Sequence, residues 1–219
     1  MTTPPRRHDL AYVPHAAALH AIEPAADAAS IDAWLFDWIA RGRPLVVARQ
    51  AFVPAGAIRL GATLPLRLGR TKVACVAKLE HVTVVPALTI ATVLDVVPAR
   101  DRRPLATLAT LAQALGIAVG VYGSTAWETL AGERYRRPGS DVDLICDVRH
   151  RDALLPWLRA MQAAARGMDE HLDGEIRFPD GQAVAWRELA QATQDARVLV
   201  KGPTDVRFAQ VGALLESLA

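Results

Sequence analysis

Two aspartates separated by one residue, Asp141 and Asp143, stand at the start of the apolar segment Asp141–Val148. On a β-strand, residues i and i+2 point to the same face with Cα atoms about 7 Å apart, so the two carboxylates share one side. Converging carboxylates are unfavourable unless a hydrogen bond, an ion pair or a metal ion compensates their charge. Because Mg²⁺ prefers carboxylate and phosphate oxygens, the pattern predicts a site for Mg²⁺, with Mn²⁺ as an alternative ion.

A second acidic pair with the same spacing, Asp173 and Glu175, lies in the segment HLDGEIRF at 171–178. If this segment is a strand, both carboxylates again lie on one face. A third carboxylate is what a second metal ion would need, and either residue is a candidate for that role or for accepting a proton. The alternative is that Asp173-Gly174 forms a turn, since both residue types are common in turns.

Gly123 and Ser124 end one predicted strand and open the next predicted helix. A helix that begins directly after a strand presents free backbone N–H groups and the positive end of its dipole, which together favour an anion such as phosphate. Gly123 permits close approach, and the Ser124 hydroxyl can donate a hydrogen bond. Lys201, at the end of the segment RVLVK, is a candidate phosphate contact; an ordinary surface lysine is the alternative.

Apolar segments bounded by glycine and proline predict the elements that position these side chains. In the C-terminal half we expect strands at 117–123, 141–148, 171–178 and 197–201, and helices from Ser124, over 150–166 and over 207–219. In the N-terminal half we expect helices at 31–41, 87–97 and 104–115, and strands within 44–53 and 72–85. The fold class is therefore α/β (α+β): a mixed sheet with helices in the C-terminal half and a smaller, strand-rich N-terminal domain. A cluster of proline and arginine at 98–104 predicts domains at 1–103 and 104–219.

Composition limits the class of protein. Hydrophobic residues make up 52% of the 219 residues, enough for a sizeable core. No apolar run reaches the roughly 18 residues of a membrane span, and the N-terminus lacks the pattern of a signal peptide. The two cysteines, Cys75 and Cys146, lie in apolar segments, which predicts buried, reduced thiols. We therefore expect a cytoplasmic protein without a membrane partner.

The window from Trp38 to Leu79 contains eight basic residues, Arg49 among them, and no acidic residue. It is either a solvated face or a surface for an anionic partner. Beyond Trp38 the window has one aromatic residue, Phe52, so the alternation of aromatic and basic residues typical of single-stranded nucleic-acid binding is absent. Phosphate compounds and acidic proteins are therefore favoured over nucleic acid.

Several short motifs carry a resemblance to a known family. They are RHDL at 7–10, PLVVxR at 44–49, GSxxWxxLxG at 123–132, SDxDL at 140–144, DGE at 173–175 and WxE at 186–188. Gly-Ser followed by Asp-x-Asp and a separate acid resembles the nucleotidyltransferase superfamily. The whole set resembles the phosphoribosyl-dephospho-CoA transferases, which make the holo acyl-carrier subunit of malonate decarboxylase.

The resemblance implies a reaction and its participants. The chain would transfer the phosphoribosyl-dephospho-CoA group from 2′-(5″-triphosphoribosyl)-3′-dephospho-CoA to a serine of the apo acyl carrier protein, releasing pyrophosphate. Asp141 and Asp143 would hold Mg²⁺, and Asp173 or Glu175 would hold a second ion or accept the serine proton. Gly123 and Ser124 would cradle the pyrophosphate. Lys201 would contact phosphate, and the basic window with Arg49 would bind the substrate or the carrier protein.

Two other functions remain open from the sequence. One is an ATP-dependent nucleotidyltransferase acting on a small molecule or a protein, which would need the same aspartates. The other is a non-catalytic nucleotidyltransferase-like binding or antitoxin module. The presence of Gly-Ser, Asp-x-Asp and a third acid together argues against an inactive module. Malonate decarboxylase is favoured over citrate lyase as the recipient system by the resemblance alone.

Overall fold

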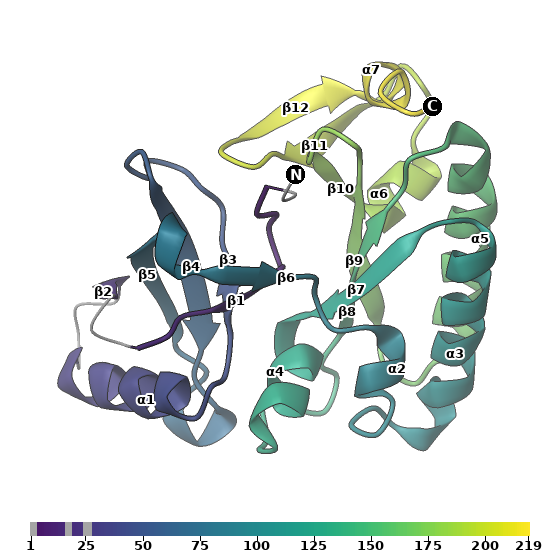
Figure 1. Ribbon diagram of the computed structural model, residues 1–219. Coiled ribbons are helices and arrows are strands. Elements are labelled where there is room, and N and C mark those ends of the chain that lie inside the picture. The colour runs from purple at the N-terminus through teal and green to yellow at the C-terminus, as the bar shows by residue number, and fades with distance from the viewer. Residues whose placement is uncertain (1–3, 16–18, 24–27) are drawn as a thin grey trace. The chain divides into compact units, whose positions relative to one another are not determined.

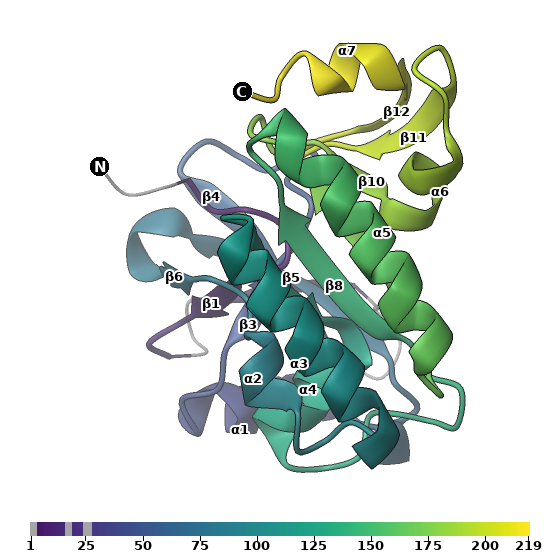
Figure 2. The ribbon, with the colours of Figure 1, turned by 90° about the vertical axis from the view of Figure 1, so that its right-hand side faces the viewer.

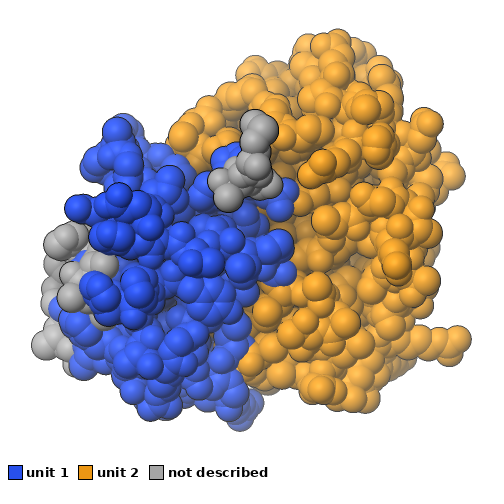
Figure 3. Space-filling model, viewed as in Figure 1, with its two compact units in different colours: residues 1–87, 130–135 blue, residues 88–129, 136–219 orange. Residues whose placement is uncertain are grey.

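The computed structural model describes residues 4–15, 19–23 and 28–219 and divides the chain into two compact units. The N-terminal unit comprises 1–87 and 130–135, and the C-terminal unit comprises 88–129 and 136–219 (Figure 3). Each unit contains one six-stranded sheet, and helices accompany both (Figure 1). This is the α/β architecture with a strand-rich N-terminal part that the sequence predicts. None of the described helices is long and apolar enough to cross a membrane.

The sheet of the N-terminal unit is antiparallel throughout, in the order β2-β5-β4-β3-β1-β6. Its strands are β1 Leu10–Tyr12, β2 His20–Glu23, β3 Leu45–Val47, β4 Ala57–Thr63, β5 Lys72–Lys78 and β6 Thr83–Val85. Buried and partly exposed residues alternate along β4, as expected for a strand with one face on a core. The unit also has helix α1 Ala28–Ala40 and the 3₁₀ turns η2 Leu66–Leu68 and η3 Leu79–His81. The indole of Trp38 in α1 donates to the Pro44 carbonyl at 2.9 Å, joining the helix to the start of β3.

The sheet of the C-terminal unit has the order β12-β11-β10-β9-β8-β7. Only β8 and β9 are parallel neighbours among these described strands; the other pairs are antiparallel. Its strands are β7 Ala118–Tyr122, β8 Val142–Asp147, β9 Leu172–Arg177, β10 Ala183–Ala185, β11 Arg197–Lys201 and β12 Val206–Gln210. Its helices are α2 Ile90–Val93, α3 Ala99–Ala114, α4 Gly123–Ala131, α5 Arg151–Gly167, α6 Trp186–Gln191 and α7 Val211–Leu215.

Helices α3 and α5 run side by side across one face of this sheet (Figure 2). Between the helices and the strands lies a continuous core, in which Trp157 and Met161 of α5 meet Leu144 of β8 and Leu172 of β9. Alternate residues of β8 and β9 thus supply the core, which leaves Asp143 and Asp173 on the opposite face. Packing of the apolar face positions the acidic side chains.

Local predictions differ from the structure at several elements. The helix expected over 87–97 is reduced to the four residues of α2. The predicted strand within 44–53 ends at Val47, and the strand that follows it, β4, was not predicted. The predicted helix over 207–219 is instead strand β12 followed by the short helix α7. All five residues of β12 pair with β11, and this pairing with a distant partner overrides the local helical pattern.

The domain boundary also lies elsewhere. The compact units divide between Ala87 and Leu88, whereas the sequence placed the boundary in the cluster at 98–104. That cluster is the first part of α3, where Pro104 stands in the first turns and Asp101 is fully buried. Pro104 lies inside the helix, so α3 continues past it with one backbone hydrogen bond fewer.

Candidate active site

Three carboxylates converge at one edge of the C-terminal sheet. One oxygen each from Asp141, Asp143 and Asp173 lies within 4.8 Å of the others. Asp143 and Asp173 are direct neighbours across the parallel strands β8 and β9, and Asp141 is exposed just before β8 begins. Asp173 and Gly174 lie inside β9, so the alternative of a turn at these residues is wrong. The sheet register therefore joins the two acidic motifs.

A glycine at the start of α4 allows the helix to approach this cluster. Gly123 has a φ of +71°, and a Cβ atom placed on it would lie 2.0 Å from an Oδ of Asp143. Any larger residue here would force the Asp143 carboxylate to move and would strain the backbone, since this φ disfavours L-residues. The N-terminus of α4 thus lies next to the carboxylate of Asp143, a candidate metal ligand. The residue that follows Gly123, Ser124, is 7% exposed.

A second glycine is required between β8 and β9. Gly174 has a φ of +143°, and a Cβ atom on it would lie 2.1 Å from the carbonyl oxygen of Leu144. This close approach stands one residue away from both Asp143 and Asp173 in the paired strands. The Gly of the DGE motif is therefore a condition for bringing the acidic residues together.

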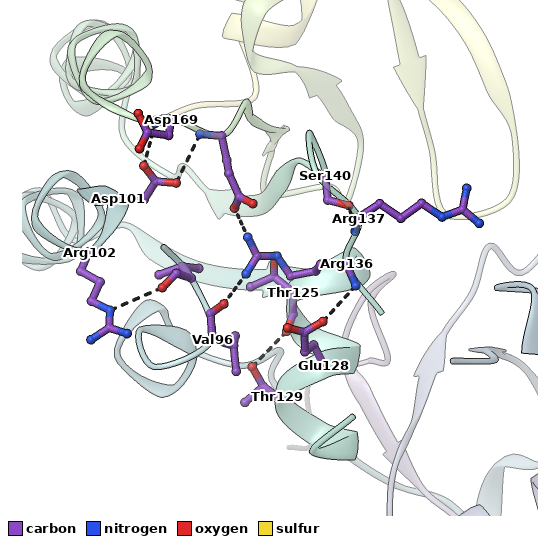
Figure 4. Close-up of polar contacts among 12 residues, drawn as sticks. Val96, Asp101, Arg102, Thr125, Glu128, Thr129, Arg136, Arg137, Ser140 and Asp169 are labelled. Atoms are coloured by element: carbon purple, nitrogen blue, oxygen red, sulfur yellow. Dashed lines mark hydrogen bonds and ion pairs between the residues drawn. The ribbon is translucent and has the colours of Figure 1, made fainter. Parts of the chain in front are cut away.

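The loop that leads into Asp141 is held by its own hydrogen bonds. The Ser140 hydroxyl accepts from the backbone N–H of Arg137 at 2.8 Å, and the Ser140 N–H donates to the Arg137 carbonyl at 3.0 Å. Ser140 is buried, and Figure 4 shows it in the loop just before the acidic strand. The serine that precedes Asp-x-Asp positions the first aspartate.

Arg136 anchors the other end of the same loop. Its guanidinium forms an ion pair with Glu170 and donates to the Val96 carbonyl, and its backbone N–H donates to the Glu128 carboxylate at 2.9 Å (Figure 4). Both charged side chains of the pair are nearly buried, with exposed fractions of 10% and 12%. Arg136 therefore joins α4, the loop and the segment before β9, and it faces protein groups.

Asp101 fixes the chain before Asp173. Its two carboxylate oxygens accept from the backbone N–H groups of Asp169 and Glu170 at 2.7 and 3.3 Å (Figure 4). Asp101 is fully buried, so these N–H groups replace the water that its charge loses. Sequence reasoning missed this residue because its cluster was interpreted as an inter-domain segment; an aspartate in the first turn of an amphipathic helix was the available signal.

Glu175 does not belong to the carboxylate cluster. It is 3% exposed and forms an ion pair with Lys201, with Nζ and Oε1 2.7 Å apart. The pair bridges β9 and β11 on the same face as Asp173, across the intervening strand β10. Of the two acidic candidates for the third carboxylate, the structure brings Asp173 to Asp141 and Asp143. Arg49 lies in the N-terminal unit.

The donor set of the cluster fits a hard divalent cation. Three carboxylates within 4.8 Å repel one another, and the oxygen ligands are those that Mg²⁺ and Mn²⁺ prefer. Mg²⁺ commonly takes one or a few carboxylates and completes its shell with water and substrate phosphates. Asp141, Asp143 and Asp173 could therefore hold the ion that phosphate chemistry requires.

Comparison with known proteins identifies the family. The sequence model of the phosphoribosyl-dephospho-CoA transferase MdcG C-terminal domain matches residues 88–211, and that of the MdcG N-terminal domain matches residues 6–87. These matches meet at the boundary between the two compact units. No solved structure matches the chain.

Individual relatives agree with these matches. A phosphoribosyl-dephospho-CoA transferase of Xanthomonas axonopodis pv. citri is 35% identical over 82% of this chain and 84% of its own length. Proteins of the same name from Xanthomonas euvesicatoria pv. vesicatoria and Bradyrhizobium diazoefficiens are 32% and 31% identical, over 95% and 85% of this chain and 95% and 82% of their own lengths. The chain belongs to the phosphoribosyl-dephospho-CoA transferase family, and it is a transferase.

Proposed function

We propose that this transferase moves the phosphoribosyl-dephospho-CoA group from 2′-(5″-triphosphoribosyl)-3′-dephospho-CoA to a serine of the apo acyl carrier subunit of malonate decarboxylase. The serine oxygen forms a bond to the α-phosphorus of the triphosphate, and the bond from that phosphorus to the bridging oxygen breaks. Pyrophosphate leaves. The observation that carries the proposal is the three-carboxylate cluster beside the N-terminus of α4.

The acidic residues have distinct parts in this proposal. Asp141, Asp143 and Asp173 hold Mg²⁺, which would neutralise charge on the triphosphate and orient it. We also assign to Asp173 the role of the general base that accepts the serine proton. Glu175 is not assigned this role, because it is nearly inaccessible and its charge is already paired with Lys201. Glu175 thus orients the ammonium of Lys201, which is 37% exposed and can contact a phosphate as well.

The leaving group needs a separate binding site. At the N-terminus of α4, unpaired backbone N–H groups and the helix dipole stabilise negative charge. Gly123 allows the phosphate oxygens to come close to the backbone, and the Ser124 hydroxyl can donate to them. Charge that develops on the departing pyrophosphate therefore meets fixed donors, which is the largest contribution that a protein makes to such a reaction.

An intact-mass assay tests the reaction. The protein and Mg²⁺ are mixed with apo carrier protein of malonate decarboxylase and the triphosphoribosyl-dephospho-CoA donor, with ATP as the control donor. We expect a mass gain equal to the phosphoribosyl-dephospho-CoA group, lost when EDTA removes the metal and absent with ATP. A mass gain from ATP would instead indicate a general nucleotidyltransferase, and the same assay with the carrier protein of citrate lyase tests the recipient.

A further inference from the structure

A hollow of about 510 Å³ lies on the sheet of the N-terminal unit, far from the carboxylates along the sequence. All of the residues that line it belong to this unit. Its floor is a row of small side chains in register across three strands, Val46 of β3, Gly61 of β4 and Ala74 of β5. Pockets that bind small ligands have volumes of about 300–1,000 Å³, so the hollow is large enough for a nucleotide.

The charged residues among those described as lining this hollow are basic. Arg59 stands on β4 two residues before Gly61, and Lys72 faces Thr63, two residues beyond it. Arg59 and Thr63 are about 13 Å apart at the Cα atoms along β4, so Arg59 and Lys72 stand at opposite ends of the floor. Arg49 is the third cation, and the described residues that line the hollow include no acid. The hollow therefore gathers part of the acid-free window into one concave surface.

An aromatic ring stands fully exposed at the same hollow. Phe52 has a relative accessibility of 103% and a φ of +55°, a backbone conformation that bulky residues rarely adopt. An exposed phenylalanine held in such a conformation loses free energy in two ways, which is typical of a residue kept for binding. It follows Arg49 by three residues in the loop after β3, and both line the hollow.

The loop that carries Arg49 and Phe52 is fixed to the sheet by Gln50, which follows Arg49 directly. The Gln50 side chain donates to the carbonyls of Ala48 and Arg59 at 2.6 and 2.9 Å, and it accepts from the Arg59 N–H at 2.9 Å. The Gln50 side chain thus makes the two hydrogen bonds to the Arg59 backbone that a neighbouring strand residue would otherwise make. These hydrogen bonds fix the backbone of the segment that carries Arg49 against β4, which reduces the entropy cost of binding.

We propose that this hollow binds the adenosine diphosphate portion of the dephospho-CoA group. Arg49 and Arg59 would hold the diphosphate, Phe52 would stack on the adenine ring, and Lys72 would add positive charge at the far end of the floor. Proteins commonly bind the base of a nucleotide by stacking it on an exposed aromatic ring, and they commonly bind its phosphates through guanidinium groups. The assignment rests on the proposed function only for the identity of the nucleotide.

The shape and the ring favour a nucleotide over an acidic protein. A basic surface for a protein partner needs charge but no concave floor of small residues, and standard protein interfaces bury about 800 Å² on each side. The single aromatic ring of Phe52 can stack on one base, and the three cations that line the hollow can bind one diphosphate. A protein partner is therefore an outcome that the experiment separates from this proposal.

The first experiment measures binding of 3′-dephospho-CoA to the full chain by calorimetry, without metal, at about 0.15 M salt. We expect Arg49→Glu and Lys72→Glu to raise the Kd tenfold or more. Lys78→Glu is the matched control, since Lys78 is an exposed lysine at the other end of the same strand β5 and outside the hollow; its Kd should change less than twofold. A wild-type Kd for Lys72→Glu, or an equal loss in Lys78→Glu, would overturn the proposal.

The second experiment tests the ring. Phe52→Ala should raise the Kd for 3′-dephospho-CoA about fivefold or more, since stacking of one base contributes about 1–3 kcal/mol. Phe36→Ala is the control, because Phe36 is 53% exposed on α1 and does not line the hollow. Adenosine alone should lose affinity with Phe52→Ala and keep it with Arg49→Glu. Equal affinities of Phe52→Ala and wild type for adenosine would contradict the stacking role.

These measurements do not depend on the transfer reaction, because 3′-dephospho-CoA lacks the triphosphate. If the hollow variants lose 3′-dephospho-CoA but the wild type transfers nothing, the proposed function fails and the binding site stands. If the wild type transfers the group and the variants keep its KM for the donor, the binding site fails and the function stands. Loss of carrier-protein affinity with unchanged 3′-dephospho-CoA affinity would make the hollow a protein-docking surface and would overturn the proposal.

Discussion

At the scale of single residues, the cluster separates acids that bind a cation from an acid that is already paired. Asp141, Asp143 and Asp173 converge, and Glu175 on the same strand face is held by Lys201. A spacing of two residues puts Asp173 and Glu175 on one face but does not say which of them lies beside the neighbouring strand's acids. The difference comes from register, because Asp143 is opposite Asp173, whereas Ile145 is opposite Glu175.

Neutralising a cluster aspartate should abolish transfer while preserving the fold. Asp143→Asn and Asp173→Asn remove a ligand charge and also relieve repulsion, so we expect unchanged or slightly higher stability with transfer reduced by about 10³-fold or more. The mass assay and thermal unfolding measure both quantities. Normal turnover in either variant would remove the metal site from the proposal.

Glu175→Gln is the matched control for those substitutions. The glutamine keeps a hydrogen-bond partner for Lys201 but loses the ion pair, so we expect a loss of about 2 kcal/mol in the free energy of unfolding. Transfer should fall less than tenfold, because Glu175 does not touch the cluster. A loss of transfer as large as that of Asp173→Asn would show that Glu175 is the proton acceptor.

Gly123→Ala tests the approach of α4 to the cluster. The added methyl would lie 2.0 Å from the Asp143 carboxylate, and alanine at a φ of +71° is strained. We expect a stability loss of about 1–2 kcal/mol and a decrease in transfer of about 10²-fold, since the carboxylate must move. Unfolding curves and donor-saturated rates measure the two effects, and unchanged rates would show that this close approach is not needed.

At the scale of elements, the loops that enter β8 and β9 are held by buried ionic contacts. Arg136 connects Glu170, Glu128 and the Val96 carbonyl, and Asp101 at the start of α3 accepts from the chain before β9. Arg136 and Asp101 therefore position Asp141 and Asp173 indirectly, through the loops that precede these two aspartates. Positioning of this kind allows a rigid arrangement to be built on otherwise irregular loops.

Arg136→Met should therefore lower both stability and transfer. The variant leaves the nearly buried carboxylate of Glu170 without its cation, for which we expect a loss of about 3–5 kcal/mol in unfolding free energy. The double variant Arg136→Met with Glu170→Leu removes both charges and should recover most of the stability. Chemical denaturation of the two variants gives the comparison, and equal losses in both would mean that the ion pair is not what matters.

At the scale of the whole molecule, each unit has its own sheet and its own buried thiol. Cys75 in β5 and Cys146 in β8 are free and fully buried. Burial raises the pKa of both thiols from 9.0 to about 12, because the thiolate would lose its hydration. This fits the predicted buried, reduced thiols and indicates inert side chains in the native protein.

The raised pKa values predict alkaline destabilisation. Each thiol stays protonated in the folded protein up to about pH 12 but ionises in the unfolded chain above pH 9, so its stabilising contribution is complete below pH 9 and is lost as the pH rises toward 12. The expected slope is about 1.4 kcal/mol per pH unit for each thiol. Denaturation at pH 8 to 11 should show a shallower decline in Cys75→Ala and Cys146→Ala; identical slopes in both variants and the wild type would contradict the shift.

The sequence alone determined which residues can take part in the chemistry and where most of the strands of the C-terminal half lie. Strands at 117–123, 141–148, 171–178 and 197–201 overlap β7, β8, β9 and β11, because apolar alternation and flanking glycines are local signals. The acidic motifs, the Gly-Ser step and the motifs that carry the family resemblance are local in the same sense, because each is a short run of neighbouring residues.

Only the tertiary structure decided which of these groups meet. Register across β8 and β9 selects Asp173 over Glu175, pairing with β11 turns 206–210 into a strand, and Asp101 in the first turn of α3 fixes the chain before β9. The gathering of Arg49, Phe52, Arg59 and Lys72 around one floor likewise depends on how β3, β4 and β5 align. These contacts join residues far apart in the chain, and their free energy comes from burial and pairing that no local window contains.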